Sequence, residues 1–337
     1  MRSAAFVALL AALGCSGPIA PPSEGKDRDG AARALVLRKR ALGVMGTSLV
    51  IEVLGEDEAE LERGIDAAVA ELRRVEDMMT SWRASPLTRL NDAAGRGPRR
   101  VPPELAHLVT ESKRIGALTD GAFDITFAGV GKLWDFKARP PVVPSREQIA
   151  RALKVVDYRR IAVDGDASTV ALPAGMRIGL GGIAKGYGVD RAMQVLIDRG
   201  IRHAFVNAGG DLKALGRKHG KSWNIAITHP RDRERVLAVI PVANRCVVTS
   251  GDYERFFVHE GRRYHHILDP RTGFPSTGCM SATVVGPSAA FCDALATACC
   301  VLDPKRALSI VESLDGVEAL VVGMDGDVQL SSGLQER

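Results

Sequence analysis

The sequence contains little that would link it to nucleic acid or to a membrane-spanning fold. Its 337 residues include 45 Lys or Arg and 40 Asp or Glu, so the formal net charge is only +5. No basic run interleaved with aromatic residues accompanies this charge, which leaves no case for nucleic-acid binding. The apolar stretch at residues 4–13 is too short to cross a bilayer as a helix.

Cysteine is also scarce, and its spacing excludes the commoner metal motifs. Five of the six cysteines follow Cys15, and an odd number leaves at least one thiol free. Cys292, Cys299 and Cys300 fall within one apolar segment, which is typical of small buried hydrophobic side chains. We therefore expect neither a zinc site nor a disulfide framework.

The N-terminus has the pattern of an export signal. Arg2 precedes the apolar stretch, and Gly14-Cys15 follows it. A small residue before cysteine resembles a bacterial lipobox, although Ala12 stands where leucine is usual. We expect residues 1–15 to direct export, with lipid anchoring through Cys15 on the periplasmic side of the inner membrane. Cleavage at another position is the alternative. Residues 16–34 are expected to form a flexible tether, and residues 35–337 the functional domain.

Hydrophobic periodicity predicts an α+β fold. Three- and four-residue spacing predicts helices over residues 58–79, 103–118, 289–302 and 304–314, and a capping box at Ser145 and Gln148 predicts a short helix. Residues 80–91 are polar and interrupted by proline, which favours a loop. Strands are expected at 47–54, 158–163, 169–172, 204–206, 212–215, 223–228, 236–241, 247–249, 255–258, 264–268, 280–285, 319–322 and 328–330.

The stretch from Met176 to Arg191 is the strongest candidate for an anion site. The pattern predicts a strand over residues 176–180, two glycines, and then a helix that ends near Gly200. Glycines before a helix N-terminus let backbone N–H groups approach a phosphate. Lys185, in the first turn, opposes the helix dipole unless an anion is present. A tight turn with a solvated lysine is an equally good interpretation of this stretch alone.

Two further patterns carry possible chemistry. The segment 265–273 presents His266, Asp269, Arg271 and Thr272 around a turn, where histidine can accept a proton and arginine can bind phosphate. A turn with a surface histidine pair is the alternative. Asp293 and Thr297 share one face of an apolar helix and could bind a hard cation. The alternative for Asp293 is helix capping.

In combination, these segments resemble the ApbE-type FAD:protein FMN transferases over about residues 43–323. The segments that carry the resemblance, in chain order, are 45–47, 82–91, 121–124 with Trp134, 181–187, 206–211, 249–251, 266–273 and 293–297. The fold implied by the resemblance is α+β and related to the T-fold. It would form a single compact unit of two lobes with FAD in a central cleft.

The implied reaction is a magnesium-dependent transfer of FMN from FAD to a threonine hydroxyl of an acceptor protein, with release of AMP. By the resemblance, Asp293, Thr297 and the backbone carbonyl of Ala184 would hold Mg²⁺, Lys185 would face the phosphates, and His266 would act as the base. The nucleotide site would be lined by Met45, Gly121, Ala122, Phe123, Asp124, Arg271 and Thr272. The acceptor would be a flavoprotein subunit of a membrane redox complex.

The chain departs from the family pattern at Gly179, where aspartate is usual, and in the loop 83–88, which is one residue short. Weaker metal affinity would follow if that aspartate supports the metal. Two other activities fit the same residues. One is an FAD pyrophosphatase that releases FMN and AMP, and the other is a non-catalytic flavin-binding lipoprotein.

Overall fold

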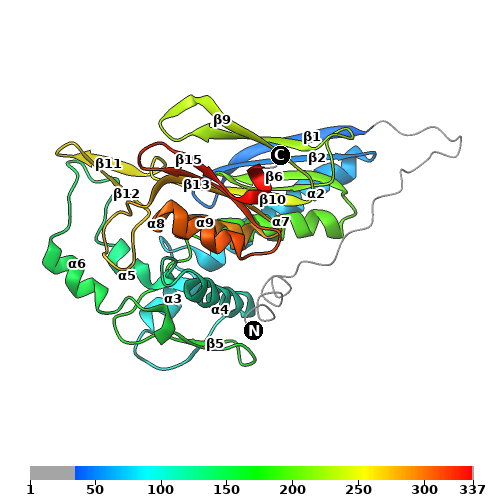
Figure 1. Cartoon of the computed structure of the whole chain (residues 1–337). Coiled ribbons are helices and arrows are strands. Elements are labelled where there is room, and N and C mark those ends of the chain that lie inside the picture. The colour runs from blue at the N-terminus through cyan, green and yellow to red at the C-terminus, as the bar shows by residue number, and fades with distance from the viewer. Residues whose placement is uncertain (1–34, 336–337) are drawn as a thin grey trace, which may run out of the picture.

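An eight-stranded sheet organises residues 35–335, the part of the chain that the computed structural model describes (Figure 1). Its order is β1-β2-β6-β7-β10-β13-β14-β15, and each neighbouring pair is antiparallel. The strands are β1 (Val36–Val44), β2 (Thr47–Gly55), β6 (His203–Ala208), β7 (Asp211–Leu215), β10 (Arg245–Gly251), β13 (Cys279–Gly286), β14 (Glu318–Gly323) and β15 (Val328–Leu330). The expected signal and tether lie outside the described residues.

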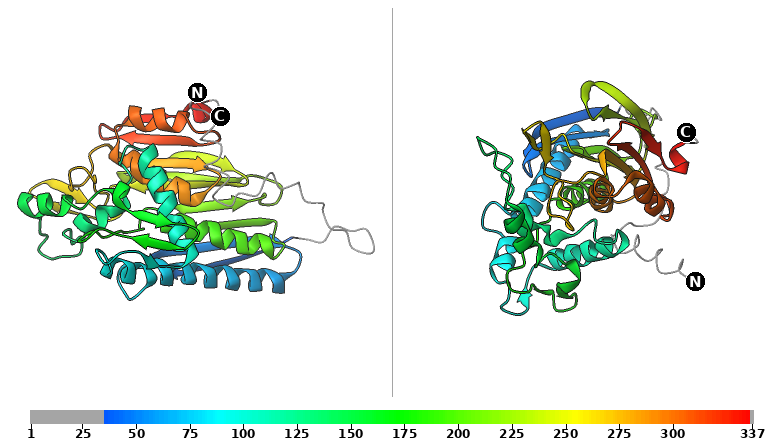
Figure 2. Two further views of the ribbon diagram at one scale, coloured as in Figure 1. Left: turned by 90° about the horizontal axis from the view of Figure 1, so that it is seen from below. Right: turned by 60° about the vertical axis from the view of Figure 1, so that its left-hand side comes forward.

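Helices cover one face of this sheet (Figure 2). They are α2 (Glu58–Met79), α7 (Ala184–Asp198), α8 (Ala289–Val301) and α9 (Pro304–Glu312). Nearly every residue of α8 is buried, because the sheet lies on one side of it and further helices lie on the other. The N-termini of α7 and α8 come very close, since a Cβ at Gly186 would lie 2.1 Å from the carbonyl oxygen of Ala289. Only glycine allows this approach of the two helices.

A hairpin of β8 (Trp223–His229) and β9 (Asp232–Val242) covers the opposite face of the sheet. Buried and exposed residues alternate along β8, as expected for a strand with one face in a core. Its inward side chains build a second hydrophobic cluster with side chains of the sheet. The members include Leu54, Leu212, Trp223, Ile225 and Val247.

Residues 80–175 form a second lobe beneath the helices (Figure 1). It contains α3 (Pro86–Asp92), α4 (Pro103–Leu118), α5 (Ala128–Gly131) and α6 (Arg146–Leu153), together with β3 (Arg99–Arg100), β4 (Ala162–Asp164) and β5 (Thr169–Ala171). A hairpin of β11 (Phe256–His259) and β12 (Arg262–His265) packs on this lobe through an aromatic cluster that includes Trp134 and Phe257. One continuous hydrophobic core joins the two lobes. The predicted α+β architecture is confirmed.

The predicted helices and most predicted strands are confirmed, but several local predictions are wrong. Residues 80–91 are not simply a loop, because α3 begins at Pro86. Ser85 caps this helix, and Thr88 completes the capping box, so the proline is its first residue and does not break it. The strand β1 was missed. It carries three consecutive basic residues, Arg38-Lys39-Arg40, and lies at the edge of the sheet, where only one neighbouring strand is required.

The predicted strand over residues 176–180 does not form, and the strand expected over 264–268 ends at His265. At residues 176–180 the side chain of Asn91 makes the backbone hydrogen bonds that a neighbouring strand would otherwise make. The amide of Asn91 donates to the carbonyl of Ile178 (2.9 Å) and accepts from its N–H (2.8 Å). The backbone groups of this apolar segment are therefore satisfied without a sheet.

The five described cysteines are free and buried, as predicted. Cys246 and Cys292 bring their sulfurs to 3.5 Å in the core between β10 and α8. Within residues 35–335, no three His, Cys, Asp or Glu side chains are grouped so that they could hold a metal ion by themselves. No helix of this range combines the length and apolar character that a membrane span requires.

Candidate functional site

The first turn of α7 places Lys185 between two buried carboxylates. Its Nζ lies 2.6 Å from Oδ2 of Asp211 and 3.3 Å from Oδ1 of Asp293. Asp211 begins β7, and Asp293 comes from the buried helix α8, so three elements distant in sequence meet here. The two carboxylates supply the anions that a lysine at a helix N-terminus requires. Lys185 is therefore not a solvated lysine in a tight turn.

The charges of this cluster are strongly coupled. Burial alone would lower the pKa of Lys185, but Asp211 and Asp293 oppose that effect and raise the pKa above its ordinary value. Burial, followed by repulsion from Asp293, raises the pKa of Asp211. Two carboxylates share one ammonium in this place, so a further cation would be needed to balance the charge if both carboxylates were ionised. Such a site favours an additional cation.

Asp293 does not cap its helix, so that alternative is wrong. Ser288 is the N-cap residue of α8 and accepts from the N–H of Phe291. The carboxylate of Asp293 instead accepts from the backbone N–H of Gly186 (3.2 Å) and faces Lys185. Thr297 lies one turn further along α8, where its Oγ1 is 3.4 Å from Oγ of Ser250.

The residues predicted to hold Mg²⁺ fit such an ion by their chemistry. Asp293 is only 2% exposed, and its carboxylate faces the ammonium of Lys185, the backbone N–H of Gly186 and the carboxyl group of Asp211. Thr297 adds a hydroxyl on the same helix face, and Ala184 is the first residue of α7, beside Lys185. Carboxylate, hydroxyl and carbonyl oxygens are the ligands that a hard divalent cation prefers.

The absence of a side chain at Gly182 leaves room for two of the predicted site residues, Thr297 and Phe123, to lie beside the turn before α7. A Cβ at this position would lie 3.1 Å from Oγ1 of Thr297 and 3.3 Å from the ring of Phe123. The glycine therefore keeps open the space between the turn before α7, the second lobe and α8. At Gly179, three residues earlier, a Cβ would lie 3.0 Å from the Cβ of Ala128, so an aspartate there would require the start of α5 to shift.

His266 follows directly after β12, and its backbone N–H donates to the carbonyl of Arg255 (3.0 Å). Burial, reinforced by the positive charges of Arg255 and Lys185 and by His265, lowers the pKa of His266 to about 4. The imidazole is therefore neutral at pH 7 and can accept a proton. Its Nδ1 is buried without a hydrogen-bond partner among the described residues.

His265 does not lie at the surface, where one interpretation of the sequence placed it. It is buried, and its Nε2 donates to the carbonyl of Ser276 (2.9 Å). This tautomer leaves Nδ1 as an acceptor, and burial lowers the pKa of His265 as well. Since a neutral, internally bonded imidazole fixes the loop 266–276, the interpretation of the pair as a surface feature is wrong.

The hairpin turn between β1 and β2 lies beside this region. Met45 (φ 53°) and Gly46 (φ 71°) both adopt left-handed conformations, as a two-residue hairpin turn requires. Left-handed backbone is unusual for methionine and is typical of functional positions. The Sδ of Met45 lies 2.9 Å from the position of a Cβ on Gly188, so its side chain packs on α7.

In two of the other segments predicted to line the nucleotide site, residues 121–124 and 271–272, the polar side chains bond mainly to residues nearby. The carboxylate of Asp124 accepts from the N–H and hydroxyl of Thr126 and from the N–H of Tyr158, so it holds the turn after Gly121, Ala122 and Phe123. Burial raises the pKa of Asp124 despite these bonds.

The second of these segments is the turn after β12. Arg271 pairs with Asp269 through two hydrogen bonds of 2.8 and 2.9 Å, and its side chain is half exposed. Thr272 is exposed and accepts from the N–H of Phe274. These residues lie at the surface, apart from the Lys185 cluster.

Sequence reasoning missed two residues of the site. Asp211 looked like a polar end of a glycine turn, and nothing local indicated that it would meet Lys185. Trp82 is 64% exposed and lies beside Gly46, where a Cβ would be 3.9 Å from Cη2 of Trp82 and 3.9 Å from Nη2 of Arg255. The signal that could have identified Trp82 is that it is the only aromatic residue within residues 80–91.

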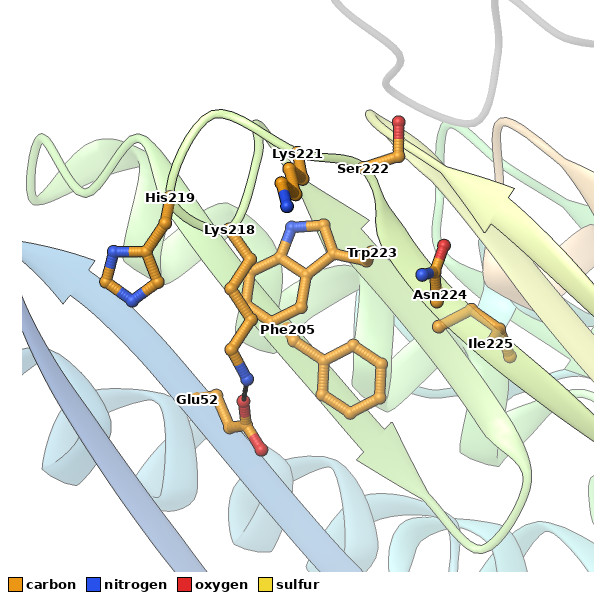
Figure 3. Close-up of a pocket in the computed structure, with 9 residues that line it drawn as sticks. All are labelled: Glu52, Phe205, Lys218, His219, Lys221, Ser222, Trp223, Asn224 and Ile225. Atoms are coloured by element: carbon orange, nitrogen blue, oxygen red, sulfur yellow. Dashed lines mark hydrogen bonds and ion pairs between the residues drawn. The ribbon is translucent and has the colours of Figure 1, made fainter.

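A hollow of about 580 Å³ lies away from these residues, between the sheet and the β7–β8 connection (Figure 3). Trp223 stacks on Phe205 with ring centroids 5.5 Å apart, and Lys218 reaches across the indole to Glu52. A second hollow lies between Gly278 and the turn at Asp325. Neither contains a predicted site residue, so the cleft expected between the lobes is not one of these two.

Comparison with known proteins gives the family. A profile of the ApbE family matches residues 45–321. An FAD:protein FMN transferase from Treponema pallidum is 34% identical over 317 residues, which cover 88% of this chain and 88% of that relative. The crystal structure of the ApbE protein from Thermotoga maritima aligns with a TM-score of 0.83 at 34% identity, over 89% of this chain and 99% of that chain. The flavin transferase ApbE from Vibrio cholerae aligns with a TM-score of 0.79 at 30% identity, over 90% and 99%. The chain therefore belongs to the ApbE family.

Proposed function

We propose that this protein is an FAD:protein FMN transferase that moves FMN from FAD to a threonine hydroxyl of an acceptor protein and releases AMP. The names of its relatives support the general activity. The observation that carries the proposal is the contact between Lys185 and Asp293 at the N-terminus of α7, with the neutral His266 close enough to Lys185 for the ammonium to help lower its pKa. This arrangement suits phosphoryl transfer, which depends chiefly on positioning and on neutralisation of charge.

The pyrophosphate of FAD would bind at the N-terminus of α7. The N–H groups of Ala184 and Gly186 already donate to the carbonyl of Leu180 and to Asp293, so the ammonium of Lys185 and the positive end of the α7 dipole would provide the attraction for phosphate. Mg²⁺ held by Asp293, Thr297 and the carbonyl of Ala184 would add charge neutralisation at the phosphates. Asp293 stays oriented by the N–H of Gly186, so this ligand does not depend on Lys185 alone.

His266 would take the proton of the acceptor threonine. As that proton leaves, the threonine oxygen forms a bond to the FMN-side phosphorus, and the bond from this phosphorus to the bridging oxygen breaks. The bridging oxygen leaves with AMP, and the products are a flavin phosphoester and protonated His266. Because burial lowers the pKa of His266 to about 4, its imidazole is in the accepting form at neutral pH.

Trp82 offers an exposed aromatic face beside the turn at Met45 and Gly46, where the flavin ring of FAD could stack. Replacing Trp82 with alanine should weaken FAD binding by about 1 kcal/mol, or roughly five-fold in Kd. Trp82→Phe should keep most of the affinity because it retains a stacking face. Quenching of FAD fluorescence on titration measures both variants. Equal affinity in Trp82→Ala and the unaltered protein would exclude this stacking role.

One experiment separates the three activities. The purified protein is incubated with FAD, MgCl₂ and a threonine-containing acceptor, and the products are followed by in-gel flavin fluorescence and by chromatography of nucleotides. Fluorescent acceptor together with AMP supports the transferase. Free FMN and AMP in equal amounts, with no labelled acceptor, would identify a pyrophosphatase. If FAD is unchanged after incubation, the non-catalytic flavin-binding alternative is the one supported.

We further propose that the protein is exported and anchored through Cys15 on the periplasmic side of the inner membrane, where it would modify a subunit of a membrane redox complex. The support is the sequence pattern at Arg2, residues 4–13 and Gly14-Cys15. Cys15→Ser should move the protein from the membrane to the soluble fraction, or stop its processing, as judged by fractionation and immunoblotting. An unchanged membrane fraction would contradict anchoring through Cys15.

A further inference from the structure

Lys185 and the proposed metal compete for the same carboxylate. The ammonium of Lys185 lies 3.3 and 3.4 Å from the two oxygens of Asp293, which is the side chain proposed as a metal ligand. Two cations cannot both contact this carboxylate at full strength, because their positive charges repel each other. Metal binding at Asp293 therefore requires that Lys185 have another partner.

Asp211 is placed to be that partner. Its Oδ2 is 2.6 Å from Nζ of Lys185, which is shorter than either distance to Asp293. The residue is 1% exposed, and β7 is paired with β6 and β10 on either side, so its backbone is fixed. Asp293 in turn keeps the hydrogen bond from Gly186 when Lys185 is withdrawn.

We propose that Lys185 is an internal cation that occupies Asp293 before the metal does, and that Asp211 is the positioning residue that retains the ammonium once the metal takes Asp293. The inference rests on the proposed metal site at Asp293 and Thr297. Without an internal cation, two buried carboxylates would face each other unpaired, which is costly. Without Asp211, the ammonium has only Asp293 to pair with and competes fully with the metal.

Affinity for Mg²⁺ alone, measured by isothermal titration of MgCl₂ without FAD, tests this arrangement. Lys185→Met removes the competing cation and should bind Mg²⁺ about ten-fold more tightly or better. Asp211→Asn removes the alternative partner and should bind Mg²⁺ about ten-fold more weakly. In the double variant the Asp211→Asn change should have little further effect, because Asp211 acts through Lys185.

Two controls keep the outcome unambiguous. Circular dichroism melts establish that each variant is folded, and Lys185→Gln serves as a second variant if Lys185→Met is not. Unchanged or weaker Mg²⁺ binding in folded Lys185 variants would overturn the competition. An equal effect of Asp211→Asn with and without Lys185 would overturn the positioning role. Failure of the proposed metal site would give a different result. Asp293→Ala would then bind Mg²⁺ as tightly as the unaltered protein does, and both the metal site and the competition by Lys185 would be overturned.

Discussion

Replacing Asp293 with alanine is expected to abolish magnesium-dependent turnover of FAD while the protein remains folded. The change removes the only carboxylate among the proposed metal ligands, and a metal contributes several kcal/mol of charge stabilisation in such reactions. A loss of about 10³-fold or more in rate follows. Lys185 keeps its hydrogen bond to Asp211, so the substitution leaves no buried ammonium without a partner. AMP release and thermal melts, each with and without MgCl₂, measure the two effects.

Asp303 offers a matched control for this prediction. It is an aspartate that does cap a helix, because its Oδ1 accepts from the N–H of Arg306 at the start of α9. Asp303→Ala should lose about 1 kcal/mol of stability and keep its activity. If Asp293→Ala behaved like Asp303→Ala, folded and fully active, Asp293 would not be a metal ligand.

His266→Ala is expected to bind FAD with nearly unchanged affinity and to transfer FMN more slowly by about 10²- to 10⁴-fold, the usual contribution of a positioned base. The lowered pKa of His266, about 4, also predicts how its contribution to the transfer rate depends on pH. Since His266 accepts protons only when neutral, its contribution should be lost as pH falls through about 4 and be complete near neutrality. FAD titration and acceptor fluorescence, measured on the same preparations, separate binding from transfer.

His259 is a better control than His265 for this experiment. It is partly exposed at the end of β11, whereas His265 is buried and bonded to the carbonyl of Ser276. His265→Ala should lose stability in the loop that carries His266, so it would not isolate the contribution of the base. His259→Ala should leave both binding and transfer intact. Undiminished transfer in His266→Ala would mean that another group is the base.

The sequence predicted the helices well because their signals are local. In α2 and α4 the apolar residues repeat at the period of a helix, and this period is set by the neighbouring residues alone. The spacing of Asp293 and Thr297 likewise placed both side chains on one face of α8. The resemblance added the roles of these residues, which no period or composition could have supplied.

Local signals misled where a side chain replaced a regular backbone partner. Ser85 and Thr88 begin a helix at a proline that looked like an interruption. The amide of Asn91 pairs with Ile178, a residue 87 positions later, and the apolar segment there needs no strand. Such pairs cannot be found from periodicity, since each depends on how the second lobe folds against the turn before α7.

The sequence by itself determined the α+β class, the position of α7 behind a glycine turn, and a polar pair on a buried helix. Only the tertiary structure decided that Asp211 lies beside Lys185, that His265 is buried while His266 borders the cluster, and that Trp82 lies beside Gly46. The physical reason is sheet order. β7 lies between β6 and β10, with β13 next to β10, and α7 and α8 pack against these strands, so contacts between residues 26 to 108 positions apart follow from topology and not from any local pattern.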